Sequence, residues 1–376
     1  MFIDLQQTDN NQEKKMKIEV YSFFSGVGFL DLGFEDAGFD IVFVDEKEER
    51  FLKSYQYARK NRKHSPRYGY SNNDVKEFLS DEIWNKTFPD YNKQKKIIKG
   101  FIGGPPCPDF SMAGKNEGEN GKNGYLTTVY AKLIIKRHPD FFVFENVKGL
   151  YQTKKHREYY EKIKRRLYKA GYTLFDSIEN SLEYGTPQFR DRLILIGFKR
   201  SIFGKYIKYT IGSNRIYNLD RINEIAWPTE NPFVENRKLC KPSGIIEELT
   251  VQYWFDKNDV VHHPNGDDVF VARNMEKFLK IPEGQLSGKS FKRLHRWRYS
   301  PTAAYGNNEV HLHPYLPRRI SVAEALAIQS LPKSFSLPQD VPLSVKFKMV
   351  GNGVPYLLAY GIAKELYEWI NDFCAN

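Results

Sequence analysis

Hydrophobic and polar positions in the first half of the chain follow two alternating patterns. Short apolar runs bounded by glycine or acidic residues are typical of strands buried in a parallel sheet. A helical pattern fills residues 29–37 between the first two runs and ends at Gly38. Strand, helix and strand in this order predict a βαβ unit and hence an α/β fold. The predicted strands are residues 18–24, 41–44, 97–102, 141–144 and 193–198.

The hydrophobic pattern loses its period after Phe198. Residues 199–317 contain short apolar runs, many turns and interspersed Lys, Arg, His and Tyr. A helical signal returns at residues 321–331, where Ser321 and Glu324 have the spacing of a capping box. We therefore expect two unlike domains, of which the second is smaller and irregular. The expected divisions are a flexible lead at 1–16, a first domain at 17–198, the irregular domain at 199–317, and a segment at 318–376 that returns to the first domain.

Charge and cysteine content narrow the class of protein. The chain has 57 Lys and Arg against 46 Asp and Glu, a net charge of +11, which favours a polyanionic partner such as nucleic acid. A basic amphipathic helix is predicted at 154–170, and we interpret its charge run as a solvated face. No stretch has the length and apolarity of a membrane span, and the polar start lacks a signal-peptide core. Three cysteines make no disulfide framework and indicate a reducing interior.

One cysteine lies in a stiff loop directly after a predicted strand. Cys107 is part of the segment 103–111, GGPPCPDFS, which follows the apolar run 97–102. In open α/β sheets, ligands bind just outside the carboxyl ends of the strands. We therefore interpret Cys107 as a candidate nucleophile; the alternative is a small buried cysteine that only fills space.

A glycine turn follows the first predicted strand. The segment 24–28, FSGVG, is a nucleotide-type turn in which glycines let the backbone approach a ligand closely. Glu46 ends the second strand, where a carboxylate can bind ribose hydroxyls, and Asp74 could accept a hydrogen bond from an adenine amino group. Asp31 stands where a dinucleotide fingerprint has its third glycine, which favours a nucleoside cofactor without a diphosphate.

Charged residues at two further strand ends complete the candidate site. Glu145 follows the apolar run 141–144, so we expect it to be desolvated, with a raised pKa, and able to donate a proton to a ring nitrogen. Arg190 and Arg192 share one face of an extended segment and suit a phosphate or a carbonyl oxygen. The alternatives are a structural carboxylate paired with an arginine, and a solvated strand end.

These segments, with RRISVAE at 318–324 and GNGV at 351–354, stand in an order that resembles the DNA cytosine-C5 methyltransferases. The resemblance implies the fold of the S-adenosylmethionine-dependent methyltransferases, a doubly wound mixed sheet with a smaller irregular target-recognition domain. It also implies transfer of a methyl group from S-adenosylmethionine to C5 of a cytosine flipped out of double-stranded DNA. The product would be S-adenosylhomocysteine, and the setting a bacterial restriction–modification system.

The resemblance also implies residue roles. Cys107 would attack C6, Glu145 would bind N3 and the exocyclic amine, and Arg190 and Arg192 would hold O2 or a phosphate and favour the thiolate. The implied cofactor residues are Phe24, Gly26, Gly28, Leu30, Glu46, Asp74, Val75, Pro106, Leu126, Asn352 and Val354. The expected DNA contacts are Ser111, Lys115 in a glycine-rich lid at 112–124, and Arg293, Arg296 and Arg298 in a basic and aromatic cluster.

The chain departs from the family pattern at three positions. Pro108 stands where the family usually has a polar amide, Phe29 replaces a frequent glycine, and Lys47 replaces an aromatic residue that would stack on adenine.

Three other functions are alternatives to a DNA methyltransferase. They are a tRNA cytosine-C5 methyltransferase of the same fold, a catalytically silent DNA-binding scaffold, and a nicotinamide dehydrogenase. The long region between Phe198 and Arg318 favours DNA over tRNA.

The expected surroundings of the protein follow from the same reasoning. We expect a monomer in the bacterial cytoplasm, associated with the nucleoid through DNA, with no membrane partner. A cognate restriction endonuclease would act on the same DNA site without a direct contact. No Cys/His set has the spacing of a structural zinc site, so we expect no metal.

Overall fold

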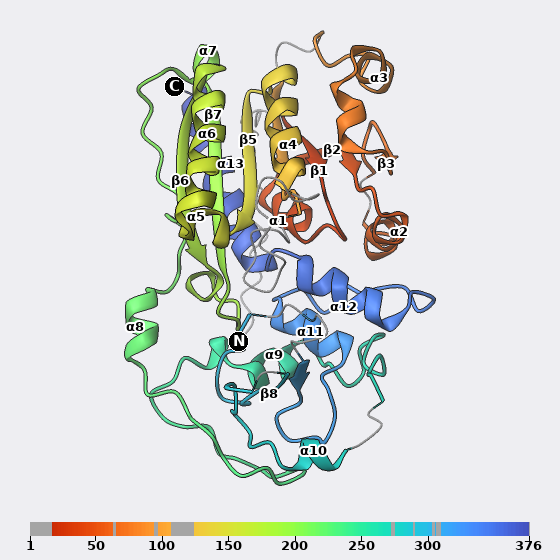
Figure 1. Ribbon diagram of the computed structural model, residues 1–376, viewed down its shortest axis with the longest axis vertical. Coiled ribbons are helices and arrows are strands. Elements are labelled where there is room, and N and C mark those ends of the chain that lie inside the picture. The colour runs from red at the N-terminus through yellow and green to blue at the C-terminus, as the bar shows by residue number, and fades with distance from the viewer. Residues whose placement is uncertain are drawn as a thin grey trace, which may run out of the picture.

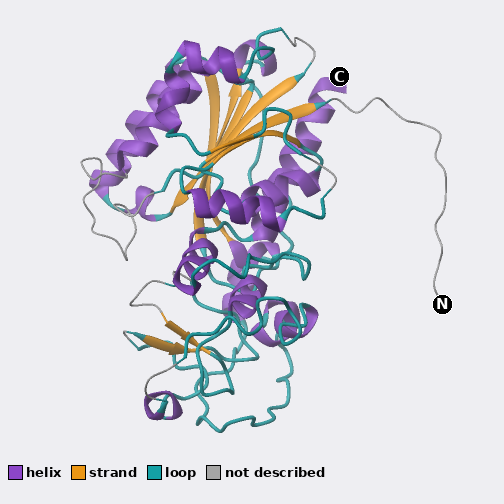
Figure 2. Ribbon diagram, turned by 90° about the vertical axis from the view of Figure 1, so that its right-hand side faces the viewer, coloured by secondary structure: helices purple, strands orange, loops and turns teal. Residues whose placement is uncertain are grey.

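The structure is a computed structural model that describes residues 17–62, 65–93, 97–106, 124–271, 275–288, 290–302, 305 and 310–375. The molecule has two lobes, with a sheet and its helices in one and mostly loops in the other (Figures 1 and 2). None of the helices in these ranges is long and apolar enough to cross a membrane.

A seven-stranded mixed sheet forms the centre of the larger lobe, in the order β3-β2-β1-β4-β5-β7-β6. All neighbouring strands are parallel except β7, which runs antiparallel between β5 and β6. The order changes direction between β1 and β4, where an open α/β sheet forms a crevice. The strands are β1 (Ile18–Phe23), β2 (Asp40–Asp45), β3 (Tyr70–Ser71), β4 (Ile98–Gly103), β5 (Phe141–Val147), β6 (Tyr172–Asn180) and β7 (Asp191–Lys199).

Helices cover both faces of the sheet, which is why the central strands are apolar on both sides. One hydrophobic cluster lies between the sheet and α4 and α6, drawn in front of it in Figure 1, and a second lies under α1 and α13. The first face carries η1 (Val75–Leu79), α3 (Asp81–Thr87), α4 (Gly124–Arg137), α5 (Gly149–Gln152) and α6 (Lys154–Lys169). The second carries α1 (Phe29–Ala37), α2 (Glu49–Ala58) and α13 (Tyr356–Ala375).

The smaller lobe has little regular structure, as expected from its irregular pattern. A third hydrophobic cluster joins α9, α11 and α12 to the lower side of α1, and a two-stranded parallel sheet pairs β8 with β9. The elements of this lobe are α8 (Leu219–Glu224), η4 (Glu247–Leu249), α9 (Val251–Lys257), α10 (Glu276–Leu279), β8 (Phe291–Arg293), β9 (Val310–Leu312), α11 (Val322–Ile328) and α12 (Leu343–Asn352). Two short helices, η3 (Ser181–Tyr184) and α7 (Arg200–Phe203), pack on the sheet lobe, against α13 and β7 respectively.

The segment that follows β7 remains packed against the sheet lobe. Tyr209 and Ile211 are buried in the same cluster as α13, and the Tyr209 ring packs 5.1 Å from that of Phe198 and 5.5 Å from that of Trp369. We propose that the irregular domain begins after Ile211, not directly after residue 198.

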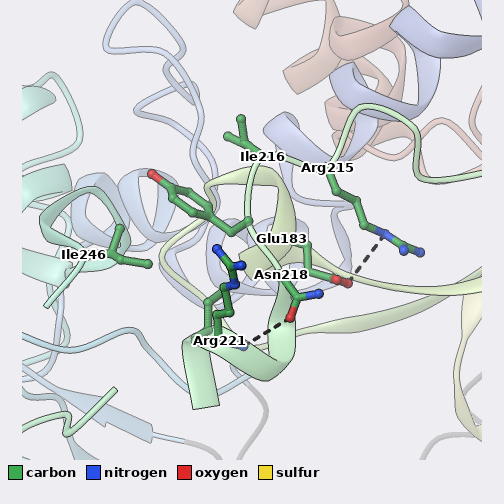
Figure 3. Close-up of a pocket in the computed structure, with 8 residues that line it drawn as sticks. Glu183, Arg215, Ile216, Asn218, Arg221 and Ile246 are labelled. Atoms are coloured by element: carbon green, nitrogen blue, oxygen red, sulfur yellow. Dashed lines mark hydrogen bonds and ion pairs between the residues drawn. The ribbon is translucent and has the colours of Figure 1, made fainter. Parts of the chain in front are cut away.

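A hollow of about 510 Å³ lies where the chain crosses toward α8 (Figure 3). Glu183 and Arg215 form an ion pair of 3.7 Å on its wall, and the Asn218 side chain caps α8 by accepting from two backbone N–H groups. None of the site residues expected from the sequence lines this hollow.

Candidate active site

The expected site residues gather at the carboxyl ends of the parallel strands, at the edge that faces the irregular lobe (Figure 1). The glycine turn follows β1, Glu46 follows β2, and Pro105 and Pro106 follow β4. Glu145 lies near the end of β5. Because these ends meet at one edge, residues far apart in sequence form a single site.

The glycine turn has the open backbone that a bound nucleoside requires. Phe24 and Gly26 both have positive φ, at 55° and 58°. A Cβ added at Gly26 would meet no atom within 4 Å. The Gly26 N–H donates to Oε2 of Glu46 at 2.8 Å, and the other oxygen of that carboxylate accepts from the N–H of Glu48 at 2.9 Å. Burial raises the pKa of Glu46, and these two N–H donors hold the group in place.

Gly28 packs against side chains of the protein, whereas Gly26 faces open space. A Cβ at Gly28 would lie 2.4 Å from both the Arg59 guanidinium and the Tyr55 ring. The Arg59 guanidinium donates to the carbonyls of Gly28 at 2.6 Å and Val27 at 3.4 Å, and lies 3.8 Å from the centroid of the Tyr55 ring. Glycine is needed here to admit Arg59, which holds the turn from the protein side. No motif or periodic pattern in the sequence pointed to Arg59.

Asp31 completes the support beneath this turn. Its buried carboxylate accepts from the hydroxyls of Ser22 at 2.9 Å and Tyr55 at 3.0 Å. Burial raises the pKa of Asp31 to about 6. The residue that replaces the third glycine of a dinucleotide fingerprint therefore anchors α1 and α2 below the turn.

Substituting Gly28 by alanine should destabilise the protein more than the same change at Gly26. Both positions have positive φ, which costs an alanine about 1–2 kcal/mol. Only Gly28 adds an overlap with Arg59 and Tyr55, so we expect at least about 2 kcal/mol of extra loss in the free energy of unfolding. Urea denaturation of both variants measures the difference. Equal losses would contradict the support assigned to Arg59.

Asp74 caps the helix that follows β3. One of its oxygens accepts from the N–H of Lys76 at 3.2 Å, and the other pairs with Nζ of Lys47 at 2.7 Å. Burial acts to raise the pKa of Asp74, but these lysine and backbone donors lower it overall. The Asp74 carboxylate is therefore fixed near the carboxyl end of β2, in an ion pair with Lys47.

The apolar cofactor residues expected from the sequence divide between two clusters. Phe24, Val75 and Leu126 pack in the cluster under α4. Leu30 and Val354 pack on the other face of the sheet, under α1 and α13. Asn352, at the end of α12, and Pro106 are exposed. The structure thus brings Phe24, Val75 and Leu126 together and gives Leu30 and Val354 a packing role.

Glu145 is a buried carboxylate held by an arginine. Its Oε1 lies 2.8 Å from Nε of Arg192, and the two side chains are only 11% and 9% exposed. Burial raises the pKa of Glu145, as expected, while Arg192 and Arg190 oppose the shift. A Cβ on Gly104 would lie 2.5 Å from Oε2. The carboxylate therefore lies between Arg192 and the loop that leads to Cys107.

Arg190 and Arg192 have different partners. The buried guanidinium of Arg190 donates to the carbonyls of Gly351 at 2.7 Å and Gly353 at 3.0 Å. It fastens the end of α12 and the residue that follows this helix to the start of β7. Arg192 reaches the Glu145 carboxylate, whereas Arg190 positions the backbone behind it. The expectation that both arginines face one ligand stays a prediction.

Two of the three arginines expected to contact DNA are structural. The buried Arg293 donates to four backbone carbonyls, and the buried Arg296 pairs with Glu283 at 2.8 Å. Both guanidinium groups hold loops of the irregular lobe together, so neither is an exposed DNA contact. Arg298 is half-buried, 5.2 Å from the centroid of the Tyr299 ring.

Several expected positions lie outside the described residues. They are Cys107, Pro108, Ser111, Lys115 and all of the lid segment except Gly124, the first residue of α4. In the described part of the chain, no group of three or more His, Cys, Asp or Glu side chains could hold a metal ion.

Comparison with known proteins assigns the family. The family model of the C-5 cytosine-specific DNA methylases matches residues 18–368. The Type II methyltransferase M.NmeDI of Neisseria meningitidis serogroup C is 52% identical over 369 residues, which cover 96% of this chain and 86% of that protein. M.FnuDI of Fusobacterium nucleatum is 29% identical, with coverages of 94% and 96%.

The fold agrees with solved structures. A putative DNA modification methyltransferase encoded within an E. coli prophage superposes with a TM-score of 0.59 at 24% identity, covering 94% of this chain and all of that one. DNMT2 of Spodoptera frugiperda gives the same TM-score at 14% identity. Together with the mixed seven-stranded sheet, these similarities confirm the fold expected from the sequence. The chain belongs to the C-5 cytosine-specific DNA methylases and is a DNA (cytosine-5) methyltransferase.

Proposed function

We propose that Glu145 and Cys107 carry out the methylation of C5 on a cytosine flipped from double-stranded DNA. The observation that carries these roles is the position of the Glu145 carboxylate, which is buried, held by Arg192 and in contact range of the Gly104 backbone. Gly104 opens the short loop that leads to Cys107. A proton donor and a sulfur nucleophile on adjoining segments suit activation of a pyrimidine ring.

Protein residues account for the bond at C6 and for the proton at N3. The thiolate of Cys107 bonds to C6 while Glu145 gives its proton to N3, which leaves C5 nucleophilic. S-adenosylmethionine, when bound, supplies the electrophilic methyl group to C5 and leaves as S-adenosylhomocysteine. The C5 proton then passes to solvent water, the electron pair of the C5–H bond forms the C5–C6 double bond, and the sulfur–C6 bond breaks to release the Cys107 thiolate. The N3 proton returns to Glu145, and the aromatic ring is restored. Arg192 stabilises the carboxylate whenever it is ionised.

The turn after β1 suits the nucleoside part of this cofactor. The space above Gly26 is open, and the Glu46 carboxylate is fixed beside it, where ribose hydroxyls would donate. Phe24, Val75 and Leu126 supply an apolar wall, and Asp74 would accept from the adenine amine. Around this core, Gly28, Leu30 and Val354 support the site from within the protein, and Pro106 and Asn352 form its rim.

The partners follow from the family and the relatives. Several relatives are named Type II methyltransferases, so we propose that this enzyme protects DNA from a cognate endonuclease of the same specificity. We further propose a monomer in the bacterial cytoplasm, using no metal. Ser111, Lys115 and Arg298 are the proposed DNA contacts, and the irregular lobe is the proposed target-recognition domain.

Incubation with tritiated S-adenosylmethionine and either duplex DNA or tRNA tests the substrate. We expect label in DNA alone; label in tRNA, or in neither polymer, would overturn the proposal. Bisulfite sequencing of DNA from an expressing host would then give the methylated motif. A duplex already methylated at C5 in that motif serves as the control and should take up no label.

A further inference from the structure

We propose that the exposed face of α6 binds the phosphate backbone of duplex DNA that flanks the target, and so holds the enzyme on long DNA. This inference rests on the proposed function, because it takes the substrate to be duplex DNA. It reverses the interpretation of this helix as a merely solvated face.

Positive charge is concentrated on this helix. Among its 16 residues are eight Lys or Arg and two Glu, a net charge of +6, whereas the whole chain carries +11. One helix therefore accounts for about half of the net charge of the protein. Such clustering on a single element is the electrostatic footprint of a polyanion-binding surface.

The charges form one stripe opposite the buried face. His156, Tyr159, Tyr160, Ile163 and Leu167 are buried toward the sheet. The rest of the helix surface exposes seven cations and one acidic residue, Glu158. Six of the cations form the stripe: Lys154, Lys155, Lys162, Arg165, Arg166 and Lys169. The seventh, Arg157, lies over the Tyr151 ring. None of these cations forms an ion pair with another described residue. The acidic Glu161 and Asp176 instead pair with Lys164, at the edge of the stripe.

Part of this arrangement opposes the helix. Lys162 and Arg166, like Arg165 and Lys169, are four residues apart, where like charges repel each other. Lys154 and Lys155 lie in the first turn, which contains no acidic residue, so they oppose the helix dipole. Only Glu158, four residues from both Lys154 and Lys162, and the position of Arg166 and Lys169 in the last turn act in the other direction. A polyanion laid along the stripe would relieve the repulsion.

The position of α6 connects the stripe with the active site. β5 carries Glu145, α5 follows it directly, and α6 begins nine residues after Glu145. The helix lies beside α4 on one face of the sheet and starts at the same strand edge as the site (Figures 1 and 2). It is about 24 Å long. A duplex of that length carries about 14 phosphates.

A charge-neutral variant tests the inference. It combines Lys155→Gln, Lys162→Gln, Arg166→Gln and Lys169→Gln. The matched control removes the same charge from exposed lysines on other parts of the sheet lobe, by Lys53→Gln, Lys60→Gln, Lys86→Gln and Lys364→Gln. The measurement is the slope of log affinity against log salt concentration, on a long duplex that lacks the target motif. We expect the slope to fall in magnitude by about 2–4 in the α6 variant and by less than about 0.5 in the control.

A short duplex that contains only the target motif separates this inference from the proposed function. Single-turnover methylation of that duplex should be the same in both variants. If the wild-type protein methylates it and the two variants show equal salt slopes, α6 has no role and the inference falls. If the wild-type protein never methylates DNA, the proposed function falls. The α6 variant could instead lose binding to anionic lipid vesicles while its salt slope on DNA stays at the wild-type value. That result would assign the α6 face to another partner and also overturn the inference.

Discussion

Replacing Glu145 by glutamine is expected to lower the rate of methyl transfer about 10²- to 10³-fold, with the affinity for S-adenosylmethionine changed less than about twofold. Glutamine has nearly the same shape and can still bond to the exocyclic amine, but it cannot transfer a proton to N3. In the proposed mechanism Glu145 contacts the base, whereas the proposed nucleoside site lies beside Glu46. Single-turnover methylation of a duplex with the target motif measures the rate, and equilibrium dialysis measures cofactor binding.

Glu179→Gln is the matched control for loss of a buried charge. Glu179 is also buried and is paired with an arginine, Arg215, at 2.6 Å, but it lies on the edge strand β6. Both variants remove the buried carboxylate nearest to an arginine, so both lose stability, although Arg215 keeps Glu183 at 3.7 Å. Only Glu145→Gln should lose activity at a temperature where both remain folded. A Glu145→Gln enzyme with more than one tenth of the wild-type rate would remove Glu145 from the chemistry.

Replacing Cys107 by alanine is expected to reduce methylation at least about 10⁴-fold, because the alanine side chain cannot form the bond to C6. A duplex that contains 5-fluorocytosine at the target gives a direct measurement. Fluorine at C5 cannot leave as a proton does, so the wild-type enzyme should stay covalently attached to the DNA. Denaturing gel electrophoresis separates the adduct from the free protein.

Cys240→Ala is the control for this variant. Cys240 is an exposed cysteine in the irregular lobe, so its removal should leave both the adduct and the rate unchanged. An adduct that persists in Cys107→Ala would show that another residue is the nucleophile. Loss of the adduct in Cys240→Ala would likewise contradict the assignment of Cys107 as the nucleophile.

The central strands could be predicted because they are buried on both sides and read as continuous apolar runs. The bounds of α1 also agree with the prediction, since Gly28 and Gly38 flank it in left-handed conformations. The strand β6 was missed. It lies at the edge of the sheet, its middle residues are only half-buried, and Asp176 and Ser177 interrupt its apolar pattern. β3 has only two residues and gives no periodic signal.

The position of a site residue could be predicted from the sequence when the residue lies at or near the end of a strand, as Glu46 and Glu145 do. It could not be predicted when the side chain is held by a partner far away in the sequence. Arg190 is an example, because β7 begins at Asp191 and the alternation of a strand therefore does not extend to it. Its partner Gly351 is 161 residues away. In the same way, the basic residues around Arg296 predict a DNA-binding surface from the sequence alone. In the structure, the Arg296 guanidinium is paired with the buried carboxylate of Glu283, a contact that the sequence pattern does not indicate.

The contact of α1 with α13 has a consequence for the order of folding events. Gly33 of α1 packs against the backbone of Ala359 and Tyr360, and Gly353 packs against the ring of Phe29. The turn after β1 is thus supported by residues far along the chain. Contacts of such long sequence separation form slowly in folding. We therefore expect the turn to become rigid only late in folding, once α13 has docked against α1.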